Sequence, residues 1–565
     1  MTDPSLIAAA PTSSAFVRAN AGSGKTHILV TRLVRLLLAG NEPEKLLCLT
    51  YTRSAAAEMK NRLFQLLSQW ALYSDVELSA AIFERLGITP DAALLPKARV
   101  LFARALETPG GLKVQTIHAF CESLLKRFPL EAGVPPQFEL LDASATEVVQ
   151  ARLALRLLHD APPERASQEL NPPELRDALA LITRELNQED MMLLVRDIVA
   201  HRGDFVPKTL NKIARALTIR LDEKTGAPLI QPEDIINDFS KAHKEQGRDV
   251  LHWLADVAAK TDLVRAQQLQ DWLGGIENIE SDAQDTRSAW HYLVGFFLDS
   301  KGLPRNNILT KSYMKAHSDW EAPLQEWQEE FVGVHKAYLA AHTYQMTAAV
   351  YCFATHFLQD YAREKQRLSR LDYDDLIECT HTLLRGRAHT AWVLYKIDQG
   401  LTHILVDEAQ DTSPSQWRVI ASLVEEFFAG AGAEIKTGGQ NQMRTIFAVG
   451  DEKQSIFSFQ GADPAAFDKQ FIQFKTQIEA AAETLHDVPL VKSWRSAPAI
   501  LEFVDKVFIG KEKALGQGKN SIHHVAHRSE AYGLVELWQA ALTPATPADA
   551  APIWQQATDG VAQAA

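Results

Sequence analysis

The stretch Ala19-Asn20-Ala21-Gly22-Ser23-Gly24-Lys25-Thr26 decides the fold of this chain. It follows the short apolar run Ala15–Val17 and precedes a helical stretch from Ile28 to Leu38, so a strand should enter the loop and a helix should leave it. Its glycines let backbone N–H groups turn inward around an anion, and the helix N-terminus adds positive charge there. A strand, a glycine-rich turn ending in Gly-Lys-Thr and a helix are what a phosphate-binding loop requires.

Lys25 and Thr26 carry the chemistry of this loop. A lysine at this place reaches the β- and γ-phosphates of a nucleoside triphosphate, and the following hydroxyl ligates Mg²⁺. Ala19 stands where the general pattern has its first glycine. We therefore predict that ATP and Mg²⁺ bind here, with the nucleotide held by Ala19, Asn20, Ala21, Gly22, Ser23, Gly24, Lys25 and Thr26.

An acidic pair supplies the second half of the predicted nucleotide site. Asp407 and Glu408 directly follow the apolar run His403–Val406, as the acidic residues of an NTPase follow a buried strand. Asp407 would hold Mg²⁺, and Glu408 would polarise the attacking water as general base. Taken alone, such a pair is equally often a helix cap; together with the phosphate loop it indicates nucleotide hydrolysis.

Strand and helix patterns vary along the chain. Apolar runs such as Leu46–Leu49 and Val114–Ile117 alternate with helical stretches near the N-terminus, which predicts a parallel sheet with crossover helices. Helical periodicity then takes over, and apolar strands such as Thr445–Val449 return later. We expect a first α/β part over 1–128, a helical insertion over 129–365, a second α/β part over 366–490, and the start of another domain with a linker over 491–565.

Within the insertion, Ser144-Ala145-Thr146-Glu147 predicts a capping box that opens a helix. The buried face of that helix should then carry Val148, Ala151, Leu155 and Leu158, which recur at helical spacing. No regular alternation of basic and aromatic residues surrounds the tryptophans of the insertion, so we expect them in the core or half-buried. They are Trp253, Trp272, Trp290, Trp320 and Trp327.

Composition excludes some classes of protein and leaves others open. The formal net charge of −13 argues against a protein that simply coats nucleic acid, although a local groove can have its own potential. No apolar run reaches the ~18 residues of a membrane span, and no signal peptide is evident at the N-terminus. The 4 cysteines are scattered and suit a reducing compartment. We expect a cytoplasmic protein without membrane contact.

With these residues in hand, the chain resembles the UvrD-like superfamily 1 helicases, motif after motif and in the family's order. Asn20 and the run Phe459–Ala462 are similar to the branch of helicase–nuclease subunits that includes AddA and RecB. The matching segments are Ala19–Thr26, Leu49–Arg53 with Ala55–Met59, Thr116–Phe120, Asp372–Leu376, Asp407–Asp411 with Gln416, Gly450–Phe457 and Lys492–Ser496.

The resemblance implies an ATP-dependent 3′-to-5′ DNA motor acting on DNA ends in double-strand break repair and recombination, with an AddB-like partner. The implied fold is a RecA-like sheet called 1A, a helical insertion called 1B and the start of a second RecA-like domain, 2A. Gln454 would sense the γ-phosphate, and Arg495 would act as an arginine finger. Tyr51 and Phe457 would stack on single-strand bases. The other implied DNA contacts are Thr50, Thr52, Thr116 and His118.

Two departures from the family pattern shape these expectations. The first glutamine of the chain is Gln65, so the adenine-reading glutamine that precedes the family's phosphate loop has no counterpart. The family's later motifs and the nuclease centre of AddA-like proteins are not found either, so we expect the first part of a longer protein, incomplete for turnover alone. A UvrD-like helicase without nuclease, or a nucleotide-gated DNA-binding module without turnover, remains an alternative.

Overall fold

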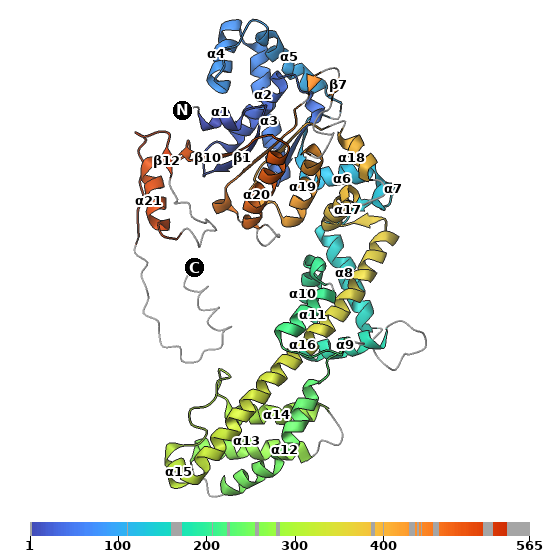
Figure 1. Ribbon diagram of the computed structural model, residues 1–565, viewed down its shortest axis with the longest axis vertical. Coiled ribbons are helices and arrows are strands. Elements are labelled where there is room, and N and C mark those ends of the chain that lie inside the picture. Colours follow the sequence, from blue (N-terminus) through green and yellow to red (C-terminus); the bar gives the residue numbers. More distant parts are fainter. Residues whose placement is uncertain are drawn as a thin grey trace, which may run out of the picture. The chain divides into compact units, whose positions relative to one another are not determined.

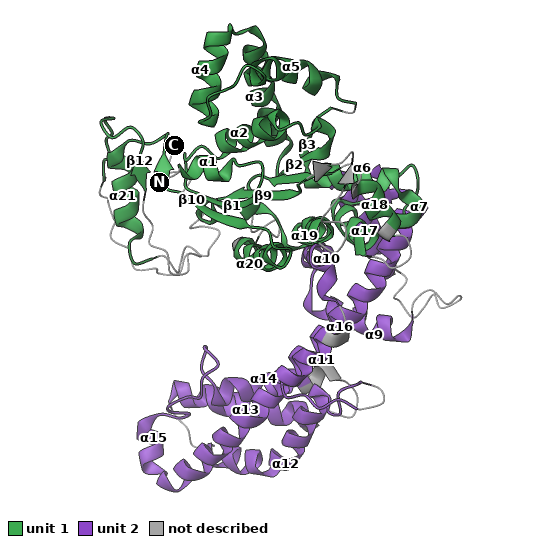
Figure 2. Cartoon of the chain, turned by 45° about the horizontal axis from the view of Figure 1, so that its top comes forward, with its two compact units in different colours: residues 1–138, 372–565 green, residues 139–371 purple. Residues whose placement is uncertain are grey.

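The computed structural model divides into two compact units, one of residues 1–138 and 372–565 and the other of residues 139–371 (Figure 2). The helical unit thus spans 139–371, where the sequence predicted an insertion over 129–365. The structure describes residues 3–109, 111–159, 172–205, 207–222, 226–254, 259–277, 283–385, 390–398, 401–428, 436–437, 440–441, 443–455, 463–511 and 524–538.

The first unit is built on a parallel sheet, which confirms the predicted α/β fold. Among the described residues, six strands pair in the order β10-β1-β9-β6-β2-β3, and every pairing is parallel. Parallel neighbours need crossover connections, and the helices between the strands supply them. The strands are β1 (Ser14–Ala19), β2 (Leu46–Thr50), β3 (Lys113–Thr116), β6 (His403–Val406), β9 (Thr445–Gly450) and β10 (Leu485–Leu490).

Helices cover both faces of this sheet (Figure 1). Ala15 and Val17 of β1 belong to the apolar core that the sheet forms with α2 (Lys25–Leu38) and α3 (Arg53–Leu72). Successive side chains of a strand point to opposite faces. Phe16 accordingly packs on the other side, 4.7 Å from the Phe467 ring of α20. The other helices of this unit are α1 (Pro4–Ala8), α4 (Asp75–Leu86), α5 (Leu94–Glu107), α6 (Ile117–Arg127), α7 (Pro129–Ala132), α17 (Tyr373–Arg385), α18 (Thr390–Asp398), α19 (Pro414–Phe428) and α20 (Pro464–Ala480).

A small βαβ element follows the sheet. Its strands β11 (Lys492–Ser493) and β12 (Val525–Ala526) pair in parallel, and α21 (Pro498–Phe508) lies between them in sequence. Part of this element has an exposed apolar surface: Ile509 is 75% exposed. The element agrees with the predicted start of a second α/β domain.

The second unit is helical and organised around α16 (Glu321–Arg367), a helix of 47 residues. The first turns of α16 contribute Trp327 and Phe331 to one apolar core, and its last turns contribute Phe353 and Phe357 to another. The remaining elements are β4 (Glu139–Leu140), α8 (Ala143–His159), α9 (Pro173–Glu185), α10 (Gln188–Ala200), α11 (Pro207–Ala216), α12 (Pro232–Trp253), α13 (Lys260–Glu277), α14 (Ala283–Phe297), α15 (Lys311–Ala316) and β5 (Arg370–Leu371).

The five tryptophans of this unit are buried or half-buried, as predicted, but the prediction for α8 is wrong in two respects. Asp142 Oδ1 accepts a hydrogen bond from Ala145 N at 2.7 Å, so Asp142 caps the helix and Ser144 lies inside its first turn. An aspartate is as good a cap as a serine, and its charge also suits the helix dipole. The buried face is shifted as well: Val148 is 64% exposed, whereas Val149 and its helical neighbours pack in the core.

A buried polar network lies where β6 and β9 begin. The His403 ring is within hydrogen-bonding distance of Thr445 Oγ1 at 2.8 Å and of Asn41 Oδ1 at 3.1 Å. Arg32, fully buried on α2, donates to Thr445 Oγ1 and to the carbonyl of Ser13. Burial, and then the Arg32 charge, lower the pKa of His403 to about 3. The fold therefore stabilises the neutral imidazole.

This network predicts a loss of stability in mild acid. The folded-state pKa of His403 lies below the ordinary 6.5, so its contribution is present above pH 6.5 and is lost as the pH falls. Between pH 7.5 and 5.5, protonation of the unfolded state should cost about 1.4 kcal/mol. We expect urea unfolding to show this difference between the wild-type protein and His403→Gln, which keeps polar partners but does not titrate. An identical pH dependence in both proteins would contradict the assignment.

Candidate nucleotide-binding and DNA-binding site

Strand order brings the predicted motifs to one edge of the sheet. β9 pairs with β1 on one side and with β6 on the other, and all three strands run in the same direction. Their carboxyl ends are Ala19, Gly450 and Val406. The phosphate loop, the turn with Gln454 and the Asp407-Glu408 pair each follow one of these ends. Ligands of open α/β sheets bind outside the carboxyl ends of the strands, so this edge is the candidate site.

The phosphate loop has the backbone that its glycines allow. Gly22 and Gly24 have φ angles of 71° and 86°, in the left-handed region that other residues rarely adopt. Gly24 is the N-cap of α2, so the first N–H groups of that helix border the loop. The Ser23 hydroxyl is buried and has no hydrogen-bond partner among the described residues. A ring of backbone donors with an unsatisfied hydroxyl fits a phosphate group.

Lys25 and Glu408 contact each other across the site. Lys25 Nζ lies 2.6 Å from Glu408 Oε2, and Gln410 Nε2 donates to the same oxygen at 2.7 Å. Glu408 has a φ of 47°, a strained conformation for a residue with a side chain. Strain of this kind costs of order 1–3 kcal/mol and is concentrated at functional sites. The two residues predicted to bind phosphate and to activate water are thus brought together.

Asp407, the residue that the sequence assigned to the metal ion, is buried at this edge of the sheet. It is 6% exposed, and burial followed by the Glu408 charge raises its pKa to about 6. A buried anion next to another anion is stabilised by a cation. Carboxylate and hydroxyl oxygens are the ligands that Mg²⁺ prefers. Asp407 and Thr26 therefore fit the ion by their chemistry, and they remain its proposed ligands.

Gln454 lies in a short turn after β9, the 3₁₀ segment η8 (Glu452–Gln454). Its Nε2 donates to Asp451 Oδ2 at 2.5 Å. Asp451 is buried, and its backbone N–H donates to Gln410 Oε1 at 2.9 Å. Because Gln410 also donates to Glu408, hydrogen bonds connect Gln454 to the acidic pair.

Arg495 and Trp494 lie next to the phosphate loop. The Trp494 N–H donates to the Gly22 carbonyl at 2.8 Å. A Cβ placed on Gly22 would come within 2.7 Å of Arg495 Cβ, so only glycine permits this approach. The Trp494 indole is 55% exposed, and its Cδ1 would lie 3.8 Å from a Cβ at Gly24. Sequence reasoning missed Trp494, although an aromatic residue directly before a candidate arginine finger was an available signal.

The predicted DNA contacts divide into exposed and buried residues. Tyr51 and His118 are partly exposed, and His118 packs edge-to-face on Tyr373. Thr52 and Thr116 cap α3 and α6 by accepting backbone N–H bonds. Thr50 is 1% exposed and donates to the Thr52 carbonyl, so the structure keeps its hydroxyl in the core. Phe457 and the run Phe459–Ala462 lie outside the described residues.

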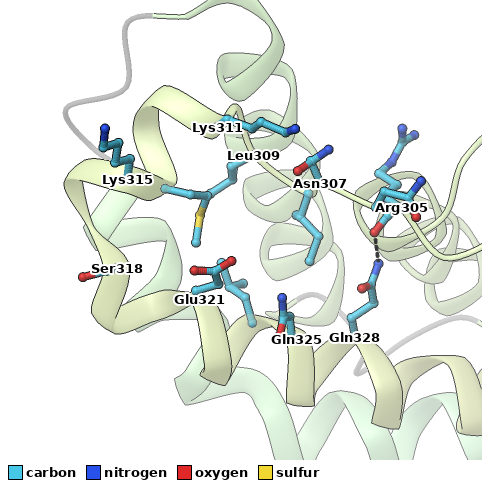
Figure 3. A pocket seen from close by; sticks show the side chains of 13 residues that line it. Arg305, Asn307, Leu309, Lys311, Lys315, Ser318, Glu321, Gln325 and Gln328 are labelled. Carbon is cyan, nitrogen blue, oxygen red and sulfur yellow. Dashed lines mark hydrogen bonds between the residues drawn. The ribbon is translucent and has the colours of Figure 1, made fainter.

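A separate hollow of about 440 Å³ lies in the helical unit (Figure 3). It is lined by polar side chains such as Lys311 and Gln325, and Gln328 Nε2 donates to the Arg305 carbonyl at 3.1 Å. None of its lining residues belongs to the motifs above. No helix in the described part of the chain is both long enough and apolar enough to cross a membrane.

Comparison with known proteins agrees with this geometry. The profile of the UvrD/REP helicase N-terminal domain matches residues 2–475, and the chain belongs to this family. Its relatives include ATP-dependent helicase/nuclease proteins, each named as the AddA component. The one from Latilactobacillus sakei is 24% identical over 87% of this chain and 53% of its own length. Those from Pediococcus pentosaceus and Enterococcus faecalis are 21% and 24% identical, each over 87% of this chain and 37% of their own length.

The predicted resemblance to helicase–nuclease proteins of the AddA type is thereby confirmed. The chain spans about half the length of the first of these relatives and less than half of the others.

Lys25 and Glu408 should fail in different ways when replaced. Lys25→Ala removes the cation that binds phosphate, so ATP binding should be lost. Glu408→Gln keeps the shape and the contact with Gln410, so binding should persist while hydrolysis falls by on the order of 10²–10⁴. Equilibrium binding of a fluorescent ATP analogue, together with a turnover assay, separates the two outcomes. Equal loss of nucleotide affinity in both variants would show that the roles are assigned wrongly.

Proposed function

We propose that this chain is the ATP-binding part of a DNA helicase motor that acts in double-strand break repair and homologous recombination. Under this proposal it moves 3′ to 5′ along single-stranded DNA, and an AddB-like protein is its partner at DNA ends. The names of its relatives support the repair role. The observation that carries the proposal is the convergence of Lys25, Glu408 and Gln454 at one sheet edge with Arg495 beside Gly22.

The contacts around Lys25 suggest the order of events. Lys25 pairs with Glu408 through an ion pair whose partners are 13% and 35% exposed. The phosphates of ATP attract Lys25, and its release leaves Glu408 free to accept a proton from water. Gln410 stays bonded to Glu408 and keeps the carboxylate in place. Mg²⁺ bound by Thr26 and Asp407 supplies positive charge for the phosphate oxygens.

Two further side chains complete the proposed site. Arg495 stabilises the charge that develops on the transferred phosphoryl group. The exposed indole of Trp494 offers the base of the nucleotide a flat surface, which would serve where the family's adenine-reading glutamine has no counterpart. Tyr51 and Phe457 are the proposed stacking surfaces for single-stranded DNA.

DNA-stimulated ATP hydrolysis tests this proposal. We expect single-stranded DNA to raise ATP turnover, and Arg495→Ala to reduce the stimulated rate by on the order of 10³, because a positioned arginine finger contributes 10³–10⁵. Arg363→Ala is the matched control, since Arg363 is 74% exposed on α16 and belongs to no motif.

Each alternative predicts a different result. ATP binding without turnover would identify a nucleotide-gated binding module. Turnover that ignores DNA, or that survives Arg495→Ala unchanged, would contradict the proposed motor.

A further inference from the structure

The phosphate loop and the Gln454 turn are joined by a side-chain contact. Lys453 Nζ donates to Asn20 Oδ1 at 2.5 Å, although the two residues are far apart in sequence. A hydrogen bond with a charged donor is roughly twice as strong as a neutral one. Lys453 is 19% exposed along its side chain and Asn20 is 8% exposed overall, so water competes only weakly for this contact.

Asn20 is itself fixed at the edge of the sheet. Its N–H donates to the Leu490 carbonyl at the end of β10, and its carbonyl accepts from Ser23 N at 3.1 Å. The backbone of Asn20 therefore belongs both to the sheet and to the phosphate loop. Any change in the loop on phosphate binding is transmitted directly to the Asn20 side chain.

A second contact holds the other side of the same turn. Arg18 Nη1 lies 2.6 Å from Glu452 Oε1, and Arg18 also pairs with Asp468 and Asp487. Arg18 is on β1, directly before the phosphate loop, and opposite Gly450 of β9. Residues 452 and 453 are thus both attached to the segment 18–20, one by a salt bridge and the other by a hydrogen bond.

Gln454 is attached more loosely than its neighbours. Within the part of the chain that the structure describes, its side chain makes a single hydrogen bond, to Asp451 of its own turn. Its amide can reach a γ-phosphate by exchanging that one bond, while the backbone of the turn stays where Glu452 and Lys453 hold it.

We propose that Asn20 and Lys453 form a positioning pair that fixes the Gln454 turn against the phosphate loop and makes the turn respond to the bound nucleotide. This inference rests on the proposed function, because it takes the loop to bind ATP. It assigns to Lys453 a role distinct from direct phosphate binding: Lys453 acts through Asn20 and through the backbone of residue 454.

Hydrogen exchange of the amides at residues 452–455, with and without a non-hydrolysable ATP analogue and Mg²⁺, tests the pair. In the wild-type chain the nucleotide should slow this exchange by about fivefold or more, because it stabilises the turn. In Asn20→Ala, Lys453→Met and the double variant the slowing should fall below about twofold, with no further loss in the double variant, because both changes remove the same contact.

Three controls separate coupling from a general loss of structure. Lys453→Arg keeps a charged donor and should restore the nucleotide response. Lys475→Met removes a lysine from the surface of α20, where it pairs with Glu479, and should behave as wild type. Nucleotide affinity should stay within about threefold of wild type in both single variants, because Lys25 and the loop amides bind the phosphates.

The outcomes distinguish this inference from the proposed function. A wild-type chain that does not bind the nucleotide would overturn both. Normal binding with an undiminished exchange response in Asn20→Ala would overturn only the positioning pair. Loss of affinity in Lys453→Met but not in Asn20→Ala would also overturn it, because Lys453 would then bind phosphate directly.

Discussion

The parallel pairing of β9 between β1 and β6 is the constraint on which the rest of the site depends. Parallel neighbours end at the same edge, so three segments that are far apart in sequence meet there without any ligand. Adding one more strand between β1 and β6 would separate Lys25 from Glu408 by about another 5 Å, the spacing of neighbouring strands. The 2.6 Å contact between these side chains is a consequence of strand order.

Charges at this edge gather in two groups. In the first, Lys25 and Gln410 stabilise the charge of Glu408, while burial and that same charge raise the pKa of Asp407. The second group surrounds Arg18, where the salt bridge with Glu452 lies among further carboxylates and burial raises the pKa of Glu452 to about 7. Both groups lie directly beside the phosphate loop, so a bound triphosphate would change the balance of charge in each.

Local patterns predicted most of the fold. The phosphate loop, the acidic pair and the apolar strands were recognisable because each is defined by residues adjacent in sequence. The cap of α8 was not, since Asp142 and Ser144 are both good caps and only tertiary packing decides which face of the helix is buried. The bond between Lys453 and Asn20 was equally out of reach, because it depends on strand order. Trp494 was passed over because a lone aromatic residue usually belongs to a core.

Photo-crosslinking with 8-azido-ATP determines directly whether nucleotide binds at the carboxyl edge of the sheet against Trp494. After irradiation and digestion, labelled peptides are identified by mass spectrometry, with excess ATP as competitor. We predict competed labelling of the peptides that contain Trp494 and the phosphate loop. Competed labelling confined to the helical unit, residues 139–371, would contradict this placement of the nucleotide.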